Sequence, residues 1–223
     1  MFLDWLFPIK HLPELLGGAL VTLELSALAF ILSLLLGTLM SIVRYTHKPR
    51  LLFPVVTAIV EIMRNTPLLV QLFFVYFGFP QFGILLSPTV AGLSVLTINS
   101  SAYYSEIVRG GIQSIPRGQW EAAYSLGLSH FQAFTRIIFP QVIRDIFPSI
   151  TNQLVLIVFG TSVFSILDVK ELTQVASILN SQSFRSLEIF VFVTLLYYGI
   201  TELTLTTSRL MYKKWFSLKT DRR

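Results

Sequence analysis

Five long apolar stretches constrain this chain more than any other feature of its sequence. They lie at about 15–43, 51–77, 88–106, 137–159 and 187–212. A helix needs about 20 mostly apolar residues to cross the hydrocarbon core of a bilayer, and each stretch is close to that length or above it. The sequence therefore predicts an all-α integral membrane protein with about five transmembrane helices.

The composition agrees with a membrane protein and excludes several other classes. Only 13% of the residues are charged, whereas soluble domains have about 25%. The chain has no cysteine and only three scattered histidines, His11, His47 and His130, so we expect no metal site. No lysine follows a G-x-x-x-x-G phosphate-binding pattern, so we expect this chain to bind no cofactor and no ATP. We attribute the net charge of +5 to membrane topology and expect no nucleic acid partner.

Basic residues set the expected orientation. They cluster directly after the first stretch, between the third and fourth stretches at 107–136, and after the fifth. With five spans these three places lie on one side of the membrane, which the positive-inside rule identifies as cytoplasmic. We therefore expect an N-terminus outside and a C-terminus in the cytoplasm. We expect a single domain over 1–223, with a membrane core over about 15–212.

The cytoplasmic part contains the segment EAAYSLGLSHFQAFTRIIFP at 121–140. Glu121, Ala122 and Ala123 are good helix formers, and Gly127 is suited to end a helix, so a short helix is predicted within 114–129. On these residues alone, an amphipathic connector on the membrane surface is favoured over a docking site for another protein.

Polar residues interrupt the second apolar stretch. Glu61, Arg64, Leu68 and Gln71 have the spacing of one helix face. Glu61 and Arg64 could pair to link helices, or the Arg64 guanidinium could bind the carboxylate of a ligand. The dipeptide at 66–67, a threonine followed by a proline, removes a backbone hydrogen bond. It predicts a bent helix that lines a cavity, or a simple packing kink.

Further polar residues lie near the centre of the third and fourth stretches. Such side chains could hydrogen-bond a polar ligand, although serine also suits tight helix packing. Two carboxylates within the first and fifth stretches, Glu24 and Glu202, are expected to pair with neighbouring helices or to reach an interface. The candidate substrate-binding residues are Arg64, Thr66, Gln71, Asn99, Ser100, Ser101, Tyr104, Asn152 and Gln153.

Several motifs resemble those of bacterial ABC importer permeases. Glu121-Ala122-Ala123, Gly127, Ile137 and Pro140 follow the EAA signature of that family, EAA-x3-G-x9-I-x2-P. The segments RNTPLLVQLFF at 64–74, SSAYYSEIVRGGIQSIPRGQWEAA at 100–123 and FPQVIRDIFPSITNQLV at 139–155 resemble the permeases of the histidine/glutamine/glutamate class in particular. The resemblance extends over about 16–210.

The resemblance implies a cytoplasmic coupling segment at about 114–132. In it, Glu121, Ala122, Ala123, Gly127 and Pro140 would contact a cytoplasmic ABC ATPase dimer, which holds ATP and Mg²⁺. Further implied partners are a second permease copy or a paralogue, an extracellular or periplasmic amino-acid-binding protein, and membrane lipid. The chain would then be a transporter subunit and no enzyme, located in a bacterial cell (inner) membrane, and it would alternate between inward-open and outward-open states.

The same resemblance bears on the substrate, a polar L-amino acid. The family often has glutamate at the position of Gln153, where a carboxylate suits a cationic substrate, so a neutral Gln153 favours glutamine or glutamate. Asn65 replaces a glycine of the family pattern, and VFGTSV at 158–163 departs from its KDTS. Two alternatives stay open: a half of a heterodimeric permease that does not contact substrate, and an ion-coupled secondary carrier that uses Arg64 and intramembrane carboxylates.

Overall fold

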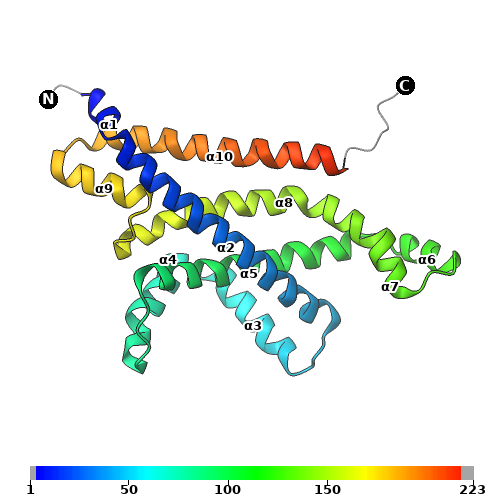
Figure 1. Ribbon diagram of the computed structural model, residues 1–223. Coiled ribbons are helices and arrows are strands. Elements are labelled where there is room, and N and C mark those ends of the chain that lie inside the picture. The colour runs from blue at the N-terminus through cyan, green and yellow to red at the C-terminus, as the bar shows by residue number, and fades with distance from the viewer. Residues whose placement is uncertain (1–3, 217–223) are drawn as a thin grey trace, which may run out of the picture.

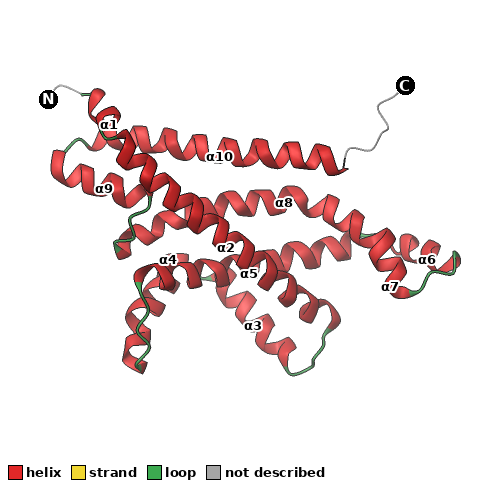
Figure 2. Ribbon diagram, viewed as in Figure 1, coloured by secondary structure: helices red, strands yellow, loops and turns green. Residues whose placement is uncertain are grey.

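The computed structural model describes residues 4–216, and within this range the secondary structure consists of helices without strands (Figure 2). The all-α fold class is confirmed. The elements in chain order are α1 (Leu6–Lys10), α2 (Leu12–Thr46), α3 (Leu52–Asn65), α4 (Leu68–Phe73), η1 (Phe74–Gly78), η2 (Phe79–Phe82), α5 (Pro88–Ser114), α6 (Arg117–Ser125), α7 (His130–Ala133), η3 (Phe134–Ile138), α8 (Phe139–Gly160), η4 (Thr161–Leu167), α9 (Leu172–Ser183) and α10 (Ser186–Phe216).

Three helical segments of the described chain are long and apolar enough to cross a membrane. They are α2, the continuous stretch His130–Leu167 and α10. The second predicted span, 51–77, is not one continuous helix, because Leu52–Asn65 and Leu68–Phe82 meet at a bend of 115°. Counted as one broken span, this pair brings the number to four.

The third predicted span lies in α5, whose composition alone does not identify it as a span. With 27 residues α5 is long enough, but many of its residues are small or polar. Ala91, Ser101 and Ala102 have no exposed surface, because α5 lies at the centre of the helix arrangement (Figure 1). A helix that is surrounded by other helices needs no apolar surface toward lipid, and small residues allow these helices to approach closely.

The contact between α2 and α5 is the most extensive between two helices of the described structure. A Cβ atom added at Gly37 would lie 2.6 Å from the carbonyl oxygen of Ser101. Ser33 and Ser41, one helical turn before and after Gly37, are also fully buried. This stripe of small residues lets the two backbones approach each other and fixes α2 diagonally across α5 (Figure 1).

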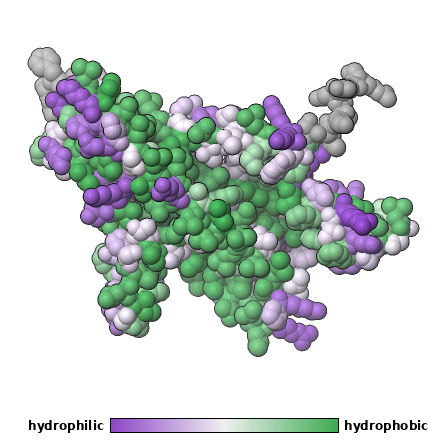
Figure 3. Space-filling view, viewed as in Figure 1, coloured by the Kyte–Doolittle hydropathy of each residue, from purple (hydrophilic) through white to green (hydrophobic). Residues whose placement is uncertain are grey.

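Apolar and polar residues are separated along the long axis of the molecule. Apolar side chains cover much of the middle of the surface in Figure 3, while hydrophilic side chains gather at the two ends and at the turn between α2 and α3. α1 and α9 lie at one end and α6 and α7 at the other (Figure 1). This distribution is the one that a protein crossing a bilayer requires.

Candidate functional site

The bend between α3 and α4 is stabilised by two buried amide side chains. Thr66 has an extended backbone (φ −126°, ψ 147°), and Pro67 has no N–H to donate. The amide nitrogen of Gln71 donates to the carbonyl oxygens of Met63 at 3.0 Å and Thr66 at 3.1 Å, and to the Thr66 hydroxyl at 2.8 Å. Asn99 of α5 donates to the Met63 carbonyl at 2.9 Å and to the Gln71 amide oxygen at 3.1 Å. Side-chain amides thus replace the backbone bonds that the bend removes.

The bend also separates four residues that the sequence placed on one helix face. The expectation that Glu61, Arg64, Leu68 and Gln71 share one helix face is wrong, because the chain turns by 115° between Arg64 and Leu68. Gln71 and Thr66 come together with Asn99 at the bend. Arg64 instead points toward a separate cluster of charges.

Glu106 of α5 is the centre of this charge cluster. Its carboxylate lies 2.6 Å from Arg109 and 3.5 Å from Arg64, and it also accepts a short hydrogen bond from Arg44 of α2. Arg44 in addition lies 3.7 Å from Glu61. The Glu61–Arg64 pair, one of the two interpretations offered by the sequence, is therefore not formed in the described structure, since Glu61 pairs with Arg44 of α2 and Arg64 with Glu106 of α5.

Arg64 is the most loosely bound arginine of the cluster. Its side chain is 36% exposed, whereas that of Arg44 is 9% exposed. Its guanidinium lies 5.8 Å from the centre of the Tyr103 ring, a distance at which cation–π attraction acts. A guanidinium has five N–H donors, and Arg64 therefore has donors available for an anion.

Ser100, Ser101 and Tyr104 lie within the core of the helix arrangement. Each is at most 1% exposed. The Ser101 hydroxyl donates to the Thr97 carbonyl at 2.6 Å, and the Tyr104 hydroxyl donates to the Ile150 carbonyl at 3.4 Å. The sequence allowed these side chains either to hydrogen-bond a polar ligand or to serve tight helix packing. Their buried positions fit tight helix packing.

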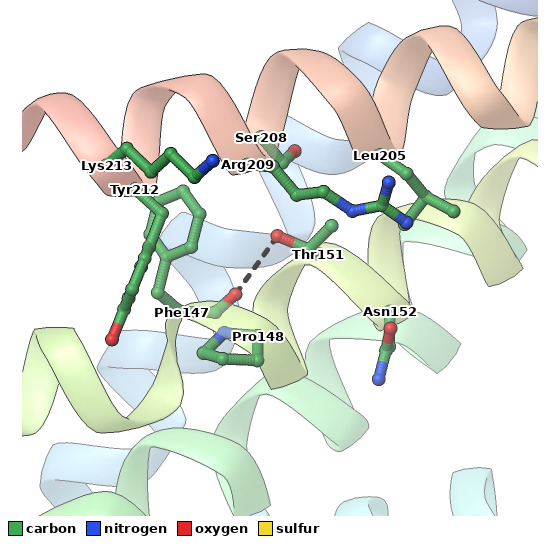
Figure 4. A pocket seen from close by; sticks show the side chains of 9 residues that line it. All are labelled: Phe147, Pro148, Thr151, Asn152, Leu205, Ser208, Arg209, Tyr212 and Lys213. Atoms are coloured by element: carbon green, nitrogen blue, oxygen red, sulfur yellow. Dashed lines mark hydrogen bonds between the residues drawn. The ribbon is translucent and has the colours of Figure 1, made fainter.

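Asn152 and Gln153 are neighbours in α8 and face different environments. Asn152 is exposed and lines a groove between α8 and α10 (Figure 4), while Gln153 is only 7% exposed. The nine candidate residues thus lie in separate places. One group lies at the α3–α4 bend and beside it, a second lies in the core around α5, and Asn152 and Gln153 lie on two sides of α8.

The predicted cytoplasmic helix is α6. Ala123 is fully buried against the rest of the molecule, while Glu121 and Ala122 are exposed. Gly127 follows in a left-handed conformation (φ 74°), and its N–H donates to the Tyr124 carbonyl at 2.9 Å, so it ends the helix as predicted. Pro140 lies in the first turn of α8, after the wide turn η3.

Large apolar side chains are exposed around α6. Leu126 is 77% exposed, Phe131 75% and Tyr124 45%. The ring of Trp120 stacks on His130 at 5.1 Å, and both line a groove together with Tyr45 of α2. Clustered exposed apolar groups with a polar rim are typical of protein interaction sites.

A fully buried carboxylate, Glu171, was not identified as a site residue from the sequence. It is fully buried between α2, α9 and α10, and it accepts hydrogen bonds from the Gln174 N–H at 2.8 Å, the Tyr197 hydroxyl at 2.9 Å and the Thr22 hydroxyl at 3.4 Å. The signal in the sequence was the apolar spacing Leu172, Ala176, Leu179, which is typical of an amphipathic helix and places Glu171 at its N-terminus.

Comparisons with known proteins agree with these features. The model of the family described as binding-protein-dependent transport system inner membrane component matches residues 20–214. The chain is 38% identical over 205 residues to a probable glutamine ABC transporter permease protein of Bacillus subtilis, covering 90% of this chain and 94% of that protein. It is 35% identical over 219 residues to a nopaline transport system permease protein of Agrobacterium fabrum, covering 93% and 89%. The crystal structure of an amino acid ABC transporter with histidines has a TM-score of 0.89 and 34% identity, covering 96% of this chain and all of that one.

Proposed function

This chain belongs to the family of binding-protein-dependent transport system inner membrane components as an amino-acid ABC transporter permease, and we propose that it imports a polar amino acid of the glutamine or glutamate type. The energy comes from ATP that is hydrolysed by a separate cytoplasmic ATPase dimer. The subunit works as a dimer with a second copy or a paralogue, and it receives its substrate from an external binding protein. Its N-terminus is outside and its C-terminus is in the cytoplasm.

The exposed face of α6 is the observation that carries the coupling part of this proposal. Glu121 and Ala122 are exposed at the end of the molecule, next to the exposed side chains of Leu126 and Phe131. A methyl group at position 122 allows a partner surface to approach the helix backbone closely. Docking of the ATPase on this face transmits its movement to α5 and α8, which flank the coupling segment in the chain.

The coupling proposal is tested by ATP-driven uptake in proteoliposomes that contain the permease and its co-purified ATPase. Ala122→Arg places a long charged side chain on the docking face without disturbing helix formation, and we expect it to abolish uptake. Ala122→Ser serves as the control and retains uptake. Gly127→Asp is expected to abolish uptake as well, while the chain still inserts into the membrane. Normal uptake by Ala122→Arg would exclude docking at this face.

The substrate part of the proposal rests on Arg64 and Gln153. Arg64 has exposed guanidinium donors beside the bend, which suit the α-carboxylate of an amino acid. Gln153 has no charge with which to attract a cationic side chain, and it can hydrogen-bond the amide or carboxylate of glutamine or glutamate. Thr66, Gln71 and Asn99 hold the bend that positions Arg64.

Competition for uptake tests the substrate. We expect unlabelled glutamine or glutamate to inhibit uptake, and arginine and histidine to inhibit it far less. Gln153→Glu should shift the preference toward arginine. Preferential uptake of arginine by the unchanged chain would contradict the role given to Gln153 and would leave the coupling proposal intact.

A second candidate is a permease half that does not itself contact substrate. It is favoured by the fact that Gln71, Asn99, Ser101 and Tyr104 all use their polar groups in contacts within the chain. This candidate predicts that Arg64→Ala and Gln153→Ala leave the affinity and specificity of uptake unchanged, while Ala122→Arg still abolishes uptake.

A further inference from the structure

The groove between α8 and α10 includes the candidate residue Asn152, but the coupling face of α6 and the substrate contacts proposed for Arg64 and Gln153 lie outside it. The groove has a volume of about 340 Å³. One wall is formed by α8 and the other by the last turns of α10 (Figure 4). The Phe147 and Tyr212 rings meet at 5.5 Å between their centres and form an apolar side of the groove.

Two cationic side chains, Arg209 and Lys213, line the same groove. They are one helical turn apart and extend along the groove in Figure 4. Both are exposed, and within residues 4–216 neither has an acidic partner within 4.0 Å. The Ser208 hydroxyl and the Asn152 amide add neutral hydrogen-bonding groups. Apolar walls, two cations and neutral donors together suit an anionic amphiphile.

The position of the groove along α10 corresponds to the edge of the bilayer. The helix has 31 residues and is about 46 Å long at 1.5 Å per residue, whereas the hydrocarbon core is about 30 Å thick. About 20 residues of helix cross the core. Counted from Leu187, where the apolar stretch 187–212 begins, they end near Leu205, which places Arg209 and Lys213 at the level of the lipid headgroups. Basic pockets between transmembrane helices on the cytoplasmic side are known to bind anionic headgroups.

We propose that the α8–α10 groove is a binding site for one anionic phospholipid of the cytoplasmic leaflet. The phosphodiester lies between the Arg209 guanidinium and the Lys213 ammonium, and the acyl chains leave the groove along Leu205 toward the bilayer. The site is separate from Arg64 and Gln153, so lipid binding does not compete with the amino acid.

The test measures which lipid the full chain retains. The purified chain is mixed with equal amounts of phosphatidylglycerol and phosphatidylcholine in detergent, and native mass spectrometry gives the ratio of the two bound lipids. Each basic residue near a membrane surface contributes about a fivefold preference for anionic lipid, so Arg209→Gln with Lys213→Gln should lower the ratio about 30-fold. The control is Arg136→Gln with Lys214→Gln, which removes the same charge outside the groove and should change the ratio less than twofold.

Four further results decide between the possible sources of the effect. Ser208→Trp fills the groove, retains both charges and should also lower the ratio; an unchanged ratio in this variant would overturn the proposal. An equal loss in the control would mean attraction to the general surface charge and would also overturn it. Inorganic phosphate should not displace phosphatidylglycerol, since displacement would identify a site for free anions. A wild-type chain that retains no lipid would indicate that another occupant, such as a second copy, covers the groove.

Discussion

Two carboxylates at helix contacts, the half-buried Glu106 and the fully buried Glu171, are stabilised in opposite ways in this molecule. Glu106 contacts three arginines from α2, α3 and α5. Glu171 is fully buried and has no basic partner within the described residues. It accepts hydrogen bonds from two hydroxyl groups and from the first turn of α9, where the positive end of the helix dipole also favours a negative charge.

The difference shows how the same side chain can connect helices by charge or by hydrogen bonds. The arginines around Glu106 compensate its charge and would lose their closest acidic partner if it were removed. Around Glu171, burial raises the pKa of the carboxyl group, and the hydrogen bonds that it accepts act against this effect. The Glu106 cluster should therefore depend on the charge of its carboxylate, and the Glu171 network on its hydrogen bonds.

The largest effect is expected for Glu106→Gln. The change leaves buried Arg44 without its main partner, and breaking a buried ion pair from one side costs about 3 kcal/mol. Chemical unfolding in mixed micelles measures the loss. Glu61→Gln is the control from the same cluster, because the Glu61 side chain is 53% exposed, and exposed pairs contribute at most about 1 kcal/mol. Equal losses in the two variants would contradict the central role of Glu106.

Glycine-to-alanine substitutions in α2 test how tightly this helix packs near Glu106 and near Glu171. At Gly37, an added Cβ would lie 2.6 Å from the Ser101 carbonyl oxygen, so the helices must move apart, and we expect Gly37→Ala to cost about 2 kcal/mol. At Gly18, near Glu171, the closest atom is the Leu172 Cα at 3.0 Å, so Gly18→Ala should cost about 1 kcal/mol. A Cβ added at Gly17 would meet no atom outside the surrounding helix backbone within 4 Å in the described structure, so Gly17→Ala should be neutral or stabilising. A larger loss at Gly18 than at Gly37 would reverse the comparison.

Removal of one hydroxyl tests the hydrogen bonds of Glu171. Tyr197→Phe removes the donor at 2.9 Å from the carboxylate, and hydrogen bonds to charged groups are worth about 1.5 kcal/mol or more. The free energy of unfolding should fall by about that amount at neutral pH. The neighbouring Tyr198 is 64% exposed, so Tyr198→Phe should leave the stability unchanged. If Tyr197→Phe leaves the free energy of unfolding unchanged, water or another group replaces the hydroxyl.

The smallest effect is a change in pH dependence. Because the pKa of Glu171 is raised above the ordinary value of 4.5, the folded state binds a proton more tightly than the unfolded state. The contribution of Glu171 to stability is therefore highest below pH 4.5 and falls as the pH rises from there toward the folded-state pKa. Glu171→Gln should remove this part of the slope. Unfolding curves from pH 4 to pH 7 for both proteins measure it, and identical slopes would show that other groups cause the dependence.

Local sequence signals identified much of the fold because they act within one element. The apolar stretches that form α2, α8 and α10 are long enough to be recognised as membrane spans from the sequence. Gly127 ends α6, as its conformational freedom suggests. The break at Pro67 was also visible, since proline removes a backbone donor wherever it stands. The composition of α5 gave a weaker signal, because a helix surrounded by protein does not need an apolar surface.

The partners of charged and polar side chains were not visible in the sequence. Spacing allowed Glu61 to pair with Arg64 within α3, but Arg44 of α2 and Glu106 of α5 pack against α3 and pair with these two side chains instead. The amide pair Gln71 and Asn99 is separated by 28 residues, and Glu171 and Thr22 by 149. Contacts of this kind depend on how helices cross, which one-dimensional periodicity does not contain.

The sequence by itself determined that this chain is a helical membrane protein with the EAA signature of ABC importer permeases. Hydrophobic length and motif spacing are properties of single segments, and they need no knowledge of neighbours. Only the tertiary structure decided that Glu106 contacts three arginines, that Glu171 is buried with no arginine beside it among residues 4–216, and that Arg209 and Lys213 share a groove with α8. The physical reason is that small residues such as Gly37 set how closely two helices approach, and this approach determines which distant side chains meet.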